Sequence, residues 1–375
     1  MTAQTVAMFR GDAAHTGSYQ ADLGPELVGL QWRFATDGSV IGSPAVLGDT
    51  VWIGSADGWC YALDRRTGAL RWKVNLHSPI SSSPAVAAGR VLVETRDGRI
   101  HALKSSTGAG IWHVDTGPDL PWHWGHESGD QWTSSPTLAG DLVVVGAGNG
   151  SVYAFEAWSG RVRWRARTGG RLRSTPAVVR GRVYVGSADG YVYCFDLASG
   201  RTVWRHATLG TTLESGDFGF DRRTVQSSPA VSGGLVFVGA RDGFLYALSA
   251  DSGALRWSFD HKVSWVNASP AVAGGAVYVG SSDGRFVQAV DAATGSEIWR
   301  TAADAIVWSS AAVVGDQLLI GDGRGRVRSY ARATGEVRLS FGTGAQVYSS
   351  PVPADSLVIF GSADGGVYAL RTGAT

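Results

Sequence analysis

Apolar and polar residues alternate with a period of two along most of this chain, which predicts β-strands with one buried face. Residues 182–193 show the unit: an apolar run to Gly186, the turn Ser-Ala-Asp-Gly, and a second apolar run. Asp-Gly between β-branched runs predicts a hairpin whose two central residues have positive φ. Similar turns stand at residues 55–58, 96–98, 148–150, 241–243, 282–284, 323–325 and 363–365.

These hairpins belong to a repeat of about 40 residues, the spacing of a β-propeller blade. Each repeat has a Ser-Pro-Ala-Val strand, a Gly turn with a second strand, the hairpin with its return strand, and a Thr-Gly turn before a Trp-containing strand. The first strands begin at Ser43, Ser83, Ser135, Thr175, Ser228, Ser269, Ser310 and Ser350. The sequence therefore predicts an all-β protein, an eight-bladed propeller of four-stranded antiparallel blades.

The two ends of the chain predict how the propeller closes. The last repeat lacks its fourth strand, and Trp32 comes without a preceding hairpin. We expect residues 29–36 to supply the outer strand of the last blade, because closure removes an exposed sheet edge. Residues 1–28 are then an N-terminal arm, and residues 29–375 form a single propeller.

A tryptophan recurs in the fourth strand of the repeat. A large flat ring there is expected to pack against the neighbouring blade, with its N–H bonded to a backbone carbonyl. The expected docking residues are Trp32, Trp72, Trp112, Trp164, Trp204, Trp257 and Trp299, and Leu339 replaces the tryptophan in the seventh repeat.

The run ALDRRTGALRW at residues 62–72 resembles the tryptophan-docking motif of the pyrroloquinoline-quinone-like propeller repeats. Residues 9–12 and 15–17 also resemble the segment that precedes the repeats of that family. The resemblance covers residues 9 to 373 and implies an eight-bladed propeller. The superfamily includes quinoprotein alcohol dehydrogenases and the outer-membrane assembly lipoprotein, so the fold alone does not assign a function.

Two insertions break the repeat, at residues 113–134 and 205–227. Both connect an outer strand to the next inner strand, so we expect them on the same face as the Asp-Gly hairpins, here called the top face. Long loops on one face of a rigid scaffold are where function is expected.

The positions just before each Ser-Pro predict the channel mouth. One set is variable and is expected to line it: Ile41, Ser81, Thr133, Arg173, Gln226, Asn267, Trp308 and Tyr348. The preceding set is apolar and is expected to pack between blades: Val40, Ile80, Trp132, Leu172, Val225, Val266, Val307 and Val347. The predicted ligand-binding residues are Trp122, Trp124, Trp132, Arg173, Glu214, Asp217, Phe218, Phe220, Arg222, Gln226, Asn267, Trp308 and Tyr348.

The candidate acid–base residues are His123, His126, Glu127 and Asp130, because histidine and carboxyl groups suit proton transfer. No metal site is predicted, since the two histidines lack the helical spacing of metalloprotease motifs. The dehydrogenases of the resembling family hold a quinone beside a vicinal cysteine pair and calcium-binding carboxylates. Cys60 and Cys194 stand apart and no carboxylate matches, so no cofactor, quinone included, is expected. Four arginines are expected on the same face, and they either clamp an anion or pair with Glu214, Asp217 or Asp221 as rim charges: Arg171, Arg173, Arg222 and Arg223.

Composition narrows the class of protein. The 33 Lys and Arg residues balance 32 Asp and Glu residues, which predicts neither nucleic-acid nor membrane binding. Two separate cysteines and an N-terminus without a basic, apolar leader favour a cytoplasmic protein. We expect a propeller that binds a small ligand or a protein partner in a top-face pocket. A cofactor-independent lyase, cyclase or isomerase and a sensor or scaffold subunit remain alternatives.

Overall fold

The structure, a computed structural model, describes residues 6–24, 26–121, 130–213, 220–262 and 264–373. It is an eight-bladed β-propeller of antiparallel blades, which confirms the predicted fold. The innermost strands are β4 (Ala45–Leu47), β8 (Ala85–Ala87), β12 (Thr137–Ala139), β16 (Ala177–Val179), β20 (Ala230–Ser232), β24 (Ala271–Ala273), β28 (Ala312–Val314) and β32 (Val352–Ala354). The second strands are β5 (Thr50–Gly54), β9 (Arg90–Glu94), β13 (Leu142–Ala147), β17 (Arg182–Gly186), β21 (Leu235–Gly239), β25 (Ala276–Ser281), β29 (Gln317–Gly321) and β33 (Leu357–Gly361).

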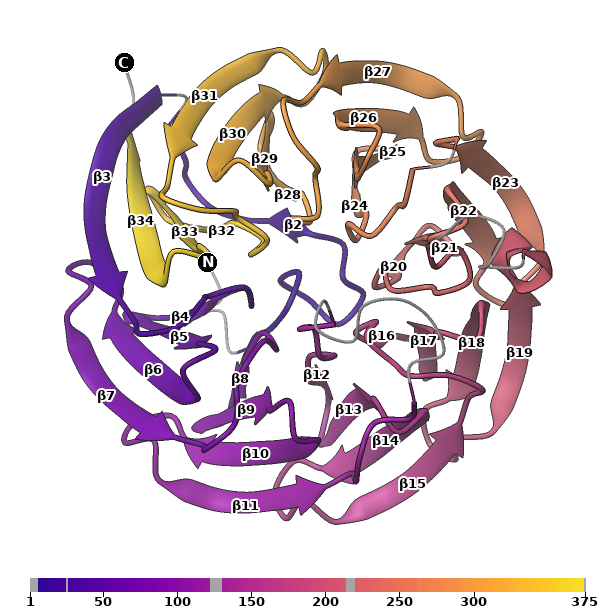
Figure 1. Cartoon of the computed structure of the whole chain (residues 1–375), viewed down its shortest axis with the longest axis horizontal. Helices are drawn as coiled ribbons and strands as arrows, with labels where there is room; N and C mark the ends of the chain where they lie inside the picture. The colour runs from indigo at the N-terminus through magenta and orange to yellow at the C-terminus, as the bar shows by residue number, and fades with distance from the viewer. Residues whose placement is uncertain (1–5, 25, 122–129, 214–219, 263, 374–375) are drawn as a thin grey trace.

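The two remaining strands complete each blade, and the blades are numbered 1 to 8 from the one that contains β4. The third strands are β6 (Trp59–Asp64), β10 (Arg99–Lys104), β14 (Ser151–Glu156), β18 (Tyr191–Asp196), β22 (Phe244–Ser249), β26 (Phe286–Asp291), β30 (Arg326–Ala331) and β34 (Gly366–Gly373). The outer strands, at the rim in Figure 1, are β7 (Leu70–Asn75), β11 (Gly110–Asp115), β15 (Val162–Arg167), β19 (Thr202–Ala207), β23 (Leu255–Asp260), β27 (Glu297–Ala302), β31 (Val337–Gly342) and β3 (Glu26–Ala35).

Strand β3 closes the ring as predicted. It pairs antiparallel with β34, so the N-terminal part of the chain supplies the outer strand of blade 8. The strand begins at Glu26 and ends at Ala35, slightly before the predicted range of 29–36. Closure of this kind leaves no free edge between the first and the last blade.

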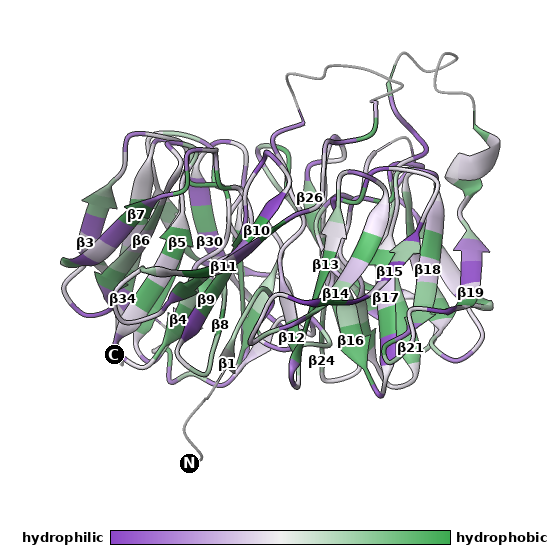
Figure 2. Cartoon of the chain, turned by 90° about the horizontal axis from the view of Figure 1, so that it is seen from below, coloured by the Kyte–Doolittle hydropathy of each residue, from purple (hydrophilic) through white to green (hydrophobic). Residues whose placement is uncertain are grey.

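The core lies between blades. Each cluster of buried apolar residues combines side chains from two neighbouring blades, such as Val51 of blade 1 with Ile359 of blade 8. Strand β17 is almost wholly buried, whereas β19 exposes alternate residues, and Figure 2 shows the corresponding change from hydrophobic to hydrophilic colour. The period-two pattern of the sequence is thus the alternation between the blade interfaces and solvent.

Seven tryptophans dock as predicted. Each donates its indole N–H to a backbone carbonyl of the next blade; Trp164, for example, donates to Leu197 O at 2.7 Å. The ring rests on the glycine of the next Thr-Gly or Ser-Gly turn, as Trp164 does on Gly200, which has a φ of +70° and no room for a Cβ. The other donors are Trp32, Trp72, Trp112, Trp204, Trp257 and Trp299.

The Asp-Gly hairpins differ in detail from the expectation. In the turn at residues 55–58, Gly58 has a φ of +87° and Asp57 does not have a positive φ. The aspartate acts through its side chain instead, because Oδ1 accepts the N–H of Trp59 at 2.9 Å and Oδ2 accepts the Tyr61 hydroxyl at 2.8 Å. An Asx-type turn therefore replaces the predicted pair of left-handed residues.

The N-terminal arm crosses the face opposite the insertions. Strand β1 (Val6–Ala7) pairs with β8, and β2 (Ser18–Tyr19) pairs with β28. Between them, arm carbonyls accept N–H groups from the inner strands of blades 4, 5, 6 and 7. The fully buried Arg10 donates to Ala311 O and to Pro270 O, so the arm seals the lower end of the channel.

Candidate functional site

The eight Ser or Thr residues that begin the inner strands form a closed ring, here called the serine ring. The backbone N–H of each residue donates to the hydroxyl of the equivalent residue in the next blade. Ser43 donates to Ser83 at 3.0 Å, and Ser350 closes the ring by donating to Ser43 at 2.9 Å. The other links run from Ser83, Ser135, Thr175, Ser228, Ser269 and Ser310. The recurring Ser-Pro motif is therefore what joins the blades around the axis.

The predicted variable set lies directly above this ring. All eight of its members line the cavity at the channel mouth, together with the serine ring, Trp132 and Phe9 of the arm. The cavity has a volume of about 90 Å³. At about 30 Å³ per molecule, this is space for roughly three waters.

Three aromatic rings meet across the mouth and form what we call the aromatic cap: Trp132, Trp308 and Tyr348. Trp308 stacks on Tyr348, with ring centroids 5.4 Å apart and an interplanar angle of 29°. Trp132 belongs to blade 3, yet its ring centroid lies 5.4 Å from that of Tyr348 in blade 8 and 6.3 Å from that of Trp308 in blade 7. Trp308 is further held because its indole N–H donates to Ser282 Oγ at 2.7 Å.

The position of Trp132 corrects the expectation that it packs between blades like the other apolar residues of its set. At the other seven junctions, a glycine at the end of the second strand or next to it accommodates the apolar residue of the next blade. The pairs are Gly54 with Ile80, Gly146 with Leu172, Gly186 with Val225, Gly239 with Val266, Gly280 with Val307, Gly321 with Val347, and Gly361 with Val40. Blade 2 has Glu94 in place of this glycine, and the bulky Trp132 lies over the channel.

Glu94 is a functional candidate that the sequence analysis missed. Glu94 is only 2% exposed, and its Oε2 atom has no hydrogen-bond partner among the described residues. Burial raises the pKa of this carboxyl well above 4.5, and the positive charge of Arg173 offsets only part of that rise. The signal in the sequence is the ending Val-Glu, where the other repeats have a glycine.

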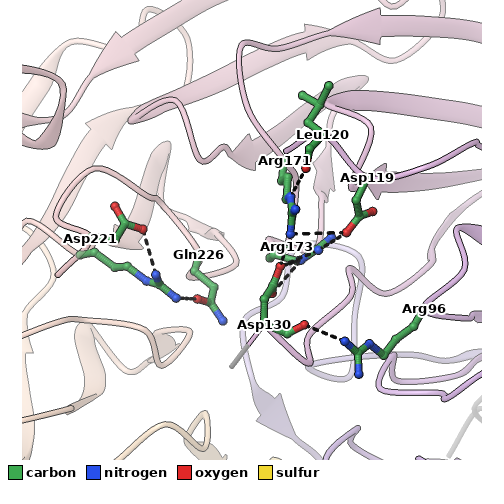
Figure 3. A network of polar contacts seen from close by, with 9 residues as sticks. Arg96, Asp119, Leu120, Asp130, Arg171, Arg173, Asp221 and Gln226 are labelled. Carbon is green, nitrogen blue, oxygen red and sulfur yellow. Dashed lines mark hydrogen bonds and ion pairs between the residues drawn. The ribbon is translucent and has the colours of Figure 1, made fainter. Parts of the chain in front are cut away.

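A polar network, the arginine clamp, holds the first insertion at both ends (Figure 3). Arg173 donates from Nε to both carboxylate oxygens of Asp130 at 3.0 Å, and its Nη2 also reaches Asp119. Arg171 donates to Asp130 Oδ2 at 2.9 Å and to Leu120 O. The side chains of Arg173 and Asp130 are only 6% and 7% exposed. Asp119 and Leu120 in the first half of the insertion and Asp130 near its end are therefore tied to blade 4.

The clamp determines the chemistry of Asp130. Burial raises the pKa of its carboxyl, but the hydrogen bonds and charges of Arg173 and Arg171 outweigh burial and lower the pKa overall. The group is an ionised partner of two guanidiniums. Its geometry suits the anchoring of a loop better than the proton transfer for which the sequence suggested it.

The second insertion has a similar anchor. Asp221 binds Arg241 at 2.9 Å and accepts the backbone N–H of Arg223 at 2.8 Å, and Arg241 also donates to Gln226 of the channel mouth. The first part of this insertion includes the single-turn 3-10 helix η2 (Leu209–Thr212).

Two predicted ligand-binding residues of this insertion lie outside the cavity lining. Phe220 packs against Trp265, with ring centroids 5.9 Å apart. Arg222 is 6% exposed and donates to Asp242 O in the hairpin of blade 5.

The structure brings together Trp132, Arg173, Gln226, Asn267, Trp308 and Tyr348 at the channel mouth. Other predicted site residues lie outside the described residues: Trp122, His123, Trp124, His126, Glu127, Glu214, Asp217 and Phe218. Within the described ranges, no three His, Cys, Asp or Glu side chains are grouped to hold a metal ion. The part of the chain that is described contains no helix long and apolar enough to cross a membrane.

A sequence profile described as outer membrane protein assembly factor BamB matches residues 29–123, 122–218, 188–288 and 285–375. The chain belongs to this family of pyrroloquinoline-quinone-like repeat propellers. A search of curated proteins found no significant match.

Solved structures share the fold. BamB from Moraxella catarrhalis is 21% identical, with a TM-score of 0.74 over 92% of this chain and 100% of that one. Quinohemoprotein alcohol dehydrogenase from Comamonas testosteroni is 16% identical, with a TM-score of 0.80 over 98% of this chain and 80% of that one. The related enzyme ADHIIG from Pseudomonas putida HK5 is 16% identical, with a TM-score of 0.81 over 100% of this chain and 81% of that one. At these identities the likeness concerns the fold alone.

Proposed function

We propose that this propeller binds a protein partner on its top face and that the aromatic cap is the central contact. The observation that carries the proposal is the meeting of Trp132, Trp308 and Tyr348 over the channel, three rings that come from blades 3, 7 and 8. Tryptophan and tyrosine are the residues most enriched at the energetic centres of protein interfaces. The arginine clamp beside the cap adds polar groups at its border.

The size of the cavity favours a protein partner over a small ligand inside the channel. Pockets for drug-sized ligands measure about 300–1,000 Å³, whereas the cavity under the cap has about 90 Å³. The small volume and the lack of a vicinal cysteine pair in the sequence support the proposal that no quinone is held there. Family membership supports the same proposal, because the matching family is described as an assembly factor.

The state of Asp130 argues against the enzyme alternative. It is the one predicted acid–base residue within the described ranges, and its carboxylate is occupied by two arginines. A proton-transfer group needs a pKa near the working pH, whereas the pKa of this carboxyl is lowered. Binding without turnover therefore accounts better for the described part of the site.

Site-specific photo-crosslinking tests the proposal. A benzoylphenylalanine in place of Trp308 should capture a discrete protein in the native cell. The same probe in place of Trp158, which is 66% exposed on blade 3 but outside the cap, is the matched control. Once the captured protein is purified, Trp308→Ala should weaken its binding by at least about tenfold. Equal capture at both positions, or unchanged affinity of Trp308→Ala, would exclude the cap as the contact.

A further inference from the structure

Charge is segregated in this chain although its total is balanced. Residues 137–207, which form blades 3 and 4, contain ten arginines and only four Asp or Glu residues. The whole chain has 33 basic and 32 acidic residues, so the residues outside this range comprise 23 basic and 28 acidic residues. The balanced total charge predicted no basic region, but blades 3 and 4 carry an excess of positive charge.

A groove between these blades, here called the 3/4 groove, is lined by two of these arginines. It has a volume of about 580 Å³. Arg167, at the end of β15, and Arg205, on β19, both line it, together with Tyr191 and Tyr193 of β18. Arg205 lies over the ring of Tyr191, with its guanidinium carbon 4.9 Å from the ring centroid. The groove opens on the top face, because Gly169 of its lining bonds to Asp189 in the hairpin of blade 4.

The guanidinium groups of Arg167 and Arg205 are not paired with a carboxylate of the described residues. Within the described ranges, neither Arg167 nor Arg205 makes an ion pair with a carboxylate, whereas Arg161 and Arg163 share Glu156. Arg167 is exposed and has no hydrogen bond to the described residues. Arg163 of β15 is therefore paired with a carboxylate, whereas Arg167 of the same strand is not.

The carboxylate in the groove is already occupied. Asp189 accepts the N–H groups of Gly169 at 2.6 Å and Tyr191 at 3.0 Å, and the hydroxyl of Tyr193 at 2.6 Å. These three donors satisfy the carboxylate of Asp189. Among the described residues, Asp189 forms no ion pair with Arg167 or Arg205.

The groove is also a departure from the repeat. At the position of Arg167, no other outer strand ends in a basic residue. The equivalent residues are Asn75, Asp115, Ala207, Asp260, Ala302, Gly342 and Ala35. Because the fold places a small, neutral or acidic residue here in every other blade, the arginine is not required by the architecture.

We propose that the 3/4 groove docks an extended acidic segment of a protein partner. A carboxylate between Arg167 and Arg205 can form the paired, charge-assisted hydrogen bonds that guanidinium geometry favours. The face of Tyr191 offers apolar contact for the stem of the same side chain. A nucleic acid is the weaker fit, because a protein that binds a duplex can contact about 6–10 phosphates, whereas the groove is lined by two arginines.

Fluorescence anisotropy with labelled hexaglutamate tests the groove on the full chain, at about 50 mM salt where surface charges are weakly screened. The groove variant is Arg167→Ala with Arg205→Ser, the residues found at these positions in blades 4 and 5. The control variant, Arg163→Ser with Arg201→Ser, removes the same charge outside the groove. We expect the groove variant to bind at least about tenfold more weakly and the control to stay within about twofold of the wild type.

Three results would overturn the proposal. Equal losses in both variants would indicate general electrostatic attraction. Binding of hexaglutamate no stronger than that of labelled hexaserine would exclude an acidic ligand. A deoxythymidine hexamer that binds in place of hexaglutamate, and is lost in the groove variant, would assign the groove to nucleic acid. Trp308→Ala should leave hexaglutamate binding unchanged, which separates a failure of the groove from a failure of the aromatic cap.

Discussion

The guanidinium of Arg173 donates to both carboxylate oxygens of Asp130, and these two side chains are nearly inaccessible to solvent. Arg173 belongs to the channel mouth, whereas Asp130 ends the first insertion. The pair therefore joins a rigid blade to the loop beside the aromatic cap. Its consequences can be tested through stability as well as through binding.

Arg173→Met should lower the free energy of unfolding by about 3–5 kcal/mol, the usual loss when one partner of a buried ion pair is removed. The physical reason is that Asp130 would remain buried beside Arg171 alone. Urea unfolding at neutral pH measures the change. Arg161→Met, which removes an exposed partner of Glu156, is the control and should have a much smaller effect. An equally small effect of both substitutions would contradict a stabilising clamp.

Glu94→Gln should stabilise the protein at neutral pH. Because the pKa of the Glu94 carboxyl is raised in the fold, the unfolded chain loses this proton first as pH rises above 4.5, and stability falls. The glutamine variant does not lose stability in this way. The difference in the free energy of unfolding between this variant and the wild type should therefore grow from about pH 4.5 upward. Unfolding curves between pH 5 and 8, in roughly one-unit steps, measure it. An advantage that is the same at every pH would show that Glu94 is not raised in pKa.

His15 should make the protein sensitive to mild acid. It is fully buried and bonds Thr137 Oγ1 at 3.2 Å, and burial with the charge of Arg10 lowers its pKa from 6.5 to about 3. The unfolded chain therefore takes up a proton below pH 6.5 that the folded chain does not, and stability falls as pH falls towards 3. One such group contributes about 1.4 kcal/mol per pH unit.

His15→Gln should reduce this slope between roughly pH 4.5 and 6 by the contribution of one proton. The exposed His77 has a φ of +61°, so His77→Asn, which tolerates that conformation, is the control. Equal slopes in both variants would show that His15 is protonated in the fold.

Trp164→Ala should cost about 3–5 kcal/mol of stability, because it removes a buried ring and leaves a cavity between blades 3 and 4. Trp164→Phe keeps most of the apolar contact but leaves Leu197 O without its donor. We expect it to cost roughly 1–3 kcal/mol. Trp158→Ala, at an exposed position, should lie within about 0.5 kcal/mol of the wild type. Thermal and urea unfolding measure the stabilities of the three variants. A Phe variant as unstable as the Ala variant would assign the whole effect to the hydrogen bond.

The sequence by itself determined the architecture, because each repeat carries its own local signals. Asp57 and Gly58 specify a hairpin, Trp72 and Gly108 specify how one blade rests on the next, and Trp32 without a hairpin predicted the closing strand. The eight residues of the channel mouth could also be predicted, because each lies two positions before the Ser or Thr that begins an inner strand. Such features depend on neighbours a few positions away, and eight copies reinforce one interpretation.

Only the tertiary structure decided what these residues meet. Trp132 follows the apolar register of its set, but blade 2 has Glu94 in place of the glycine that accommodates the equivalent residue elsewhere, and the ring of Trp132 lies over the channel. Asp130 has the chemistry of an acid–base residue, but Arg173, 43 positions away, holds it as an ion pair. Burial and charge partners of this kind arise between blades, and no local pattern in the sequence records which side chains the closed ring brings together.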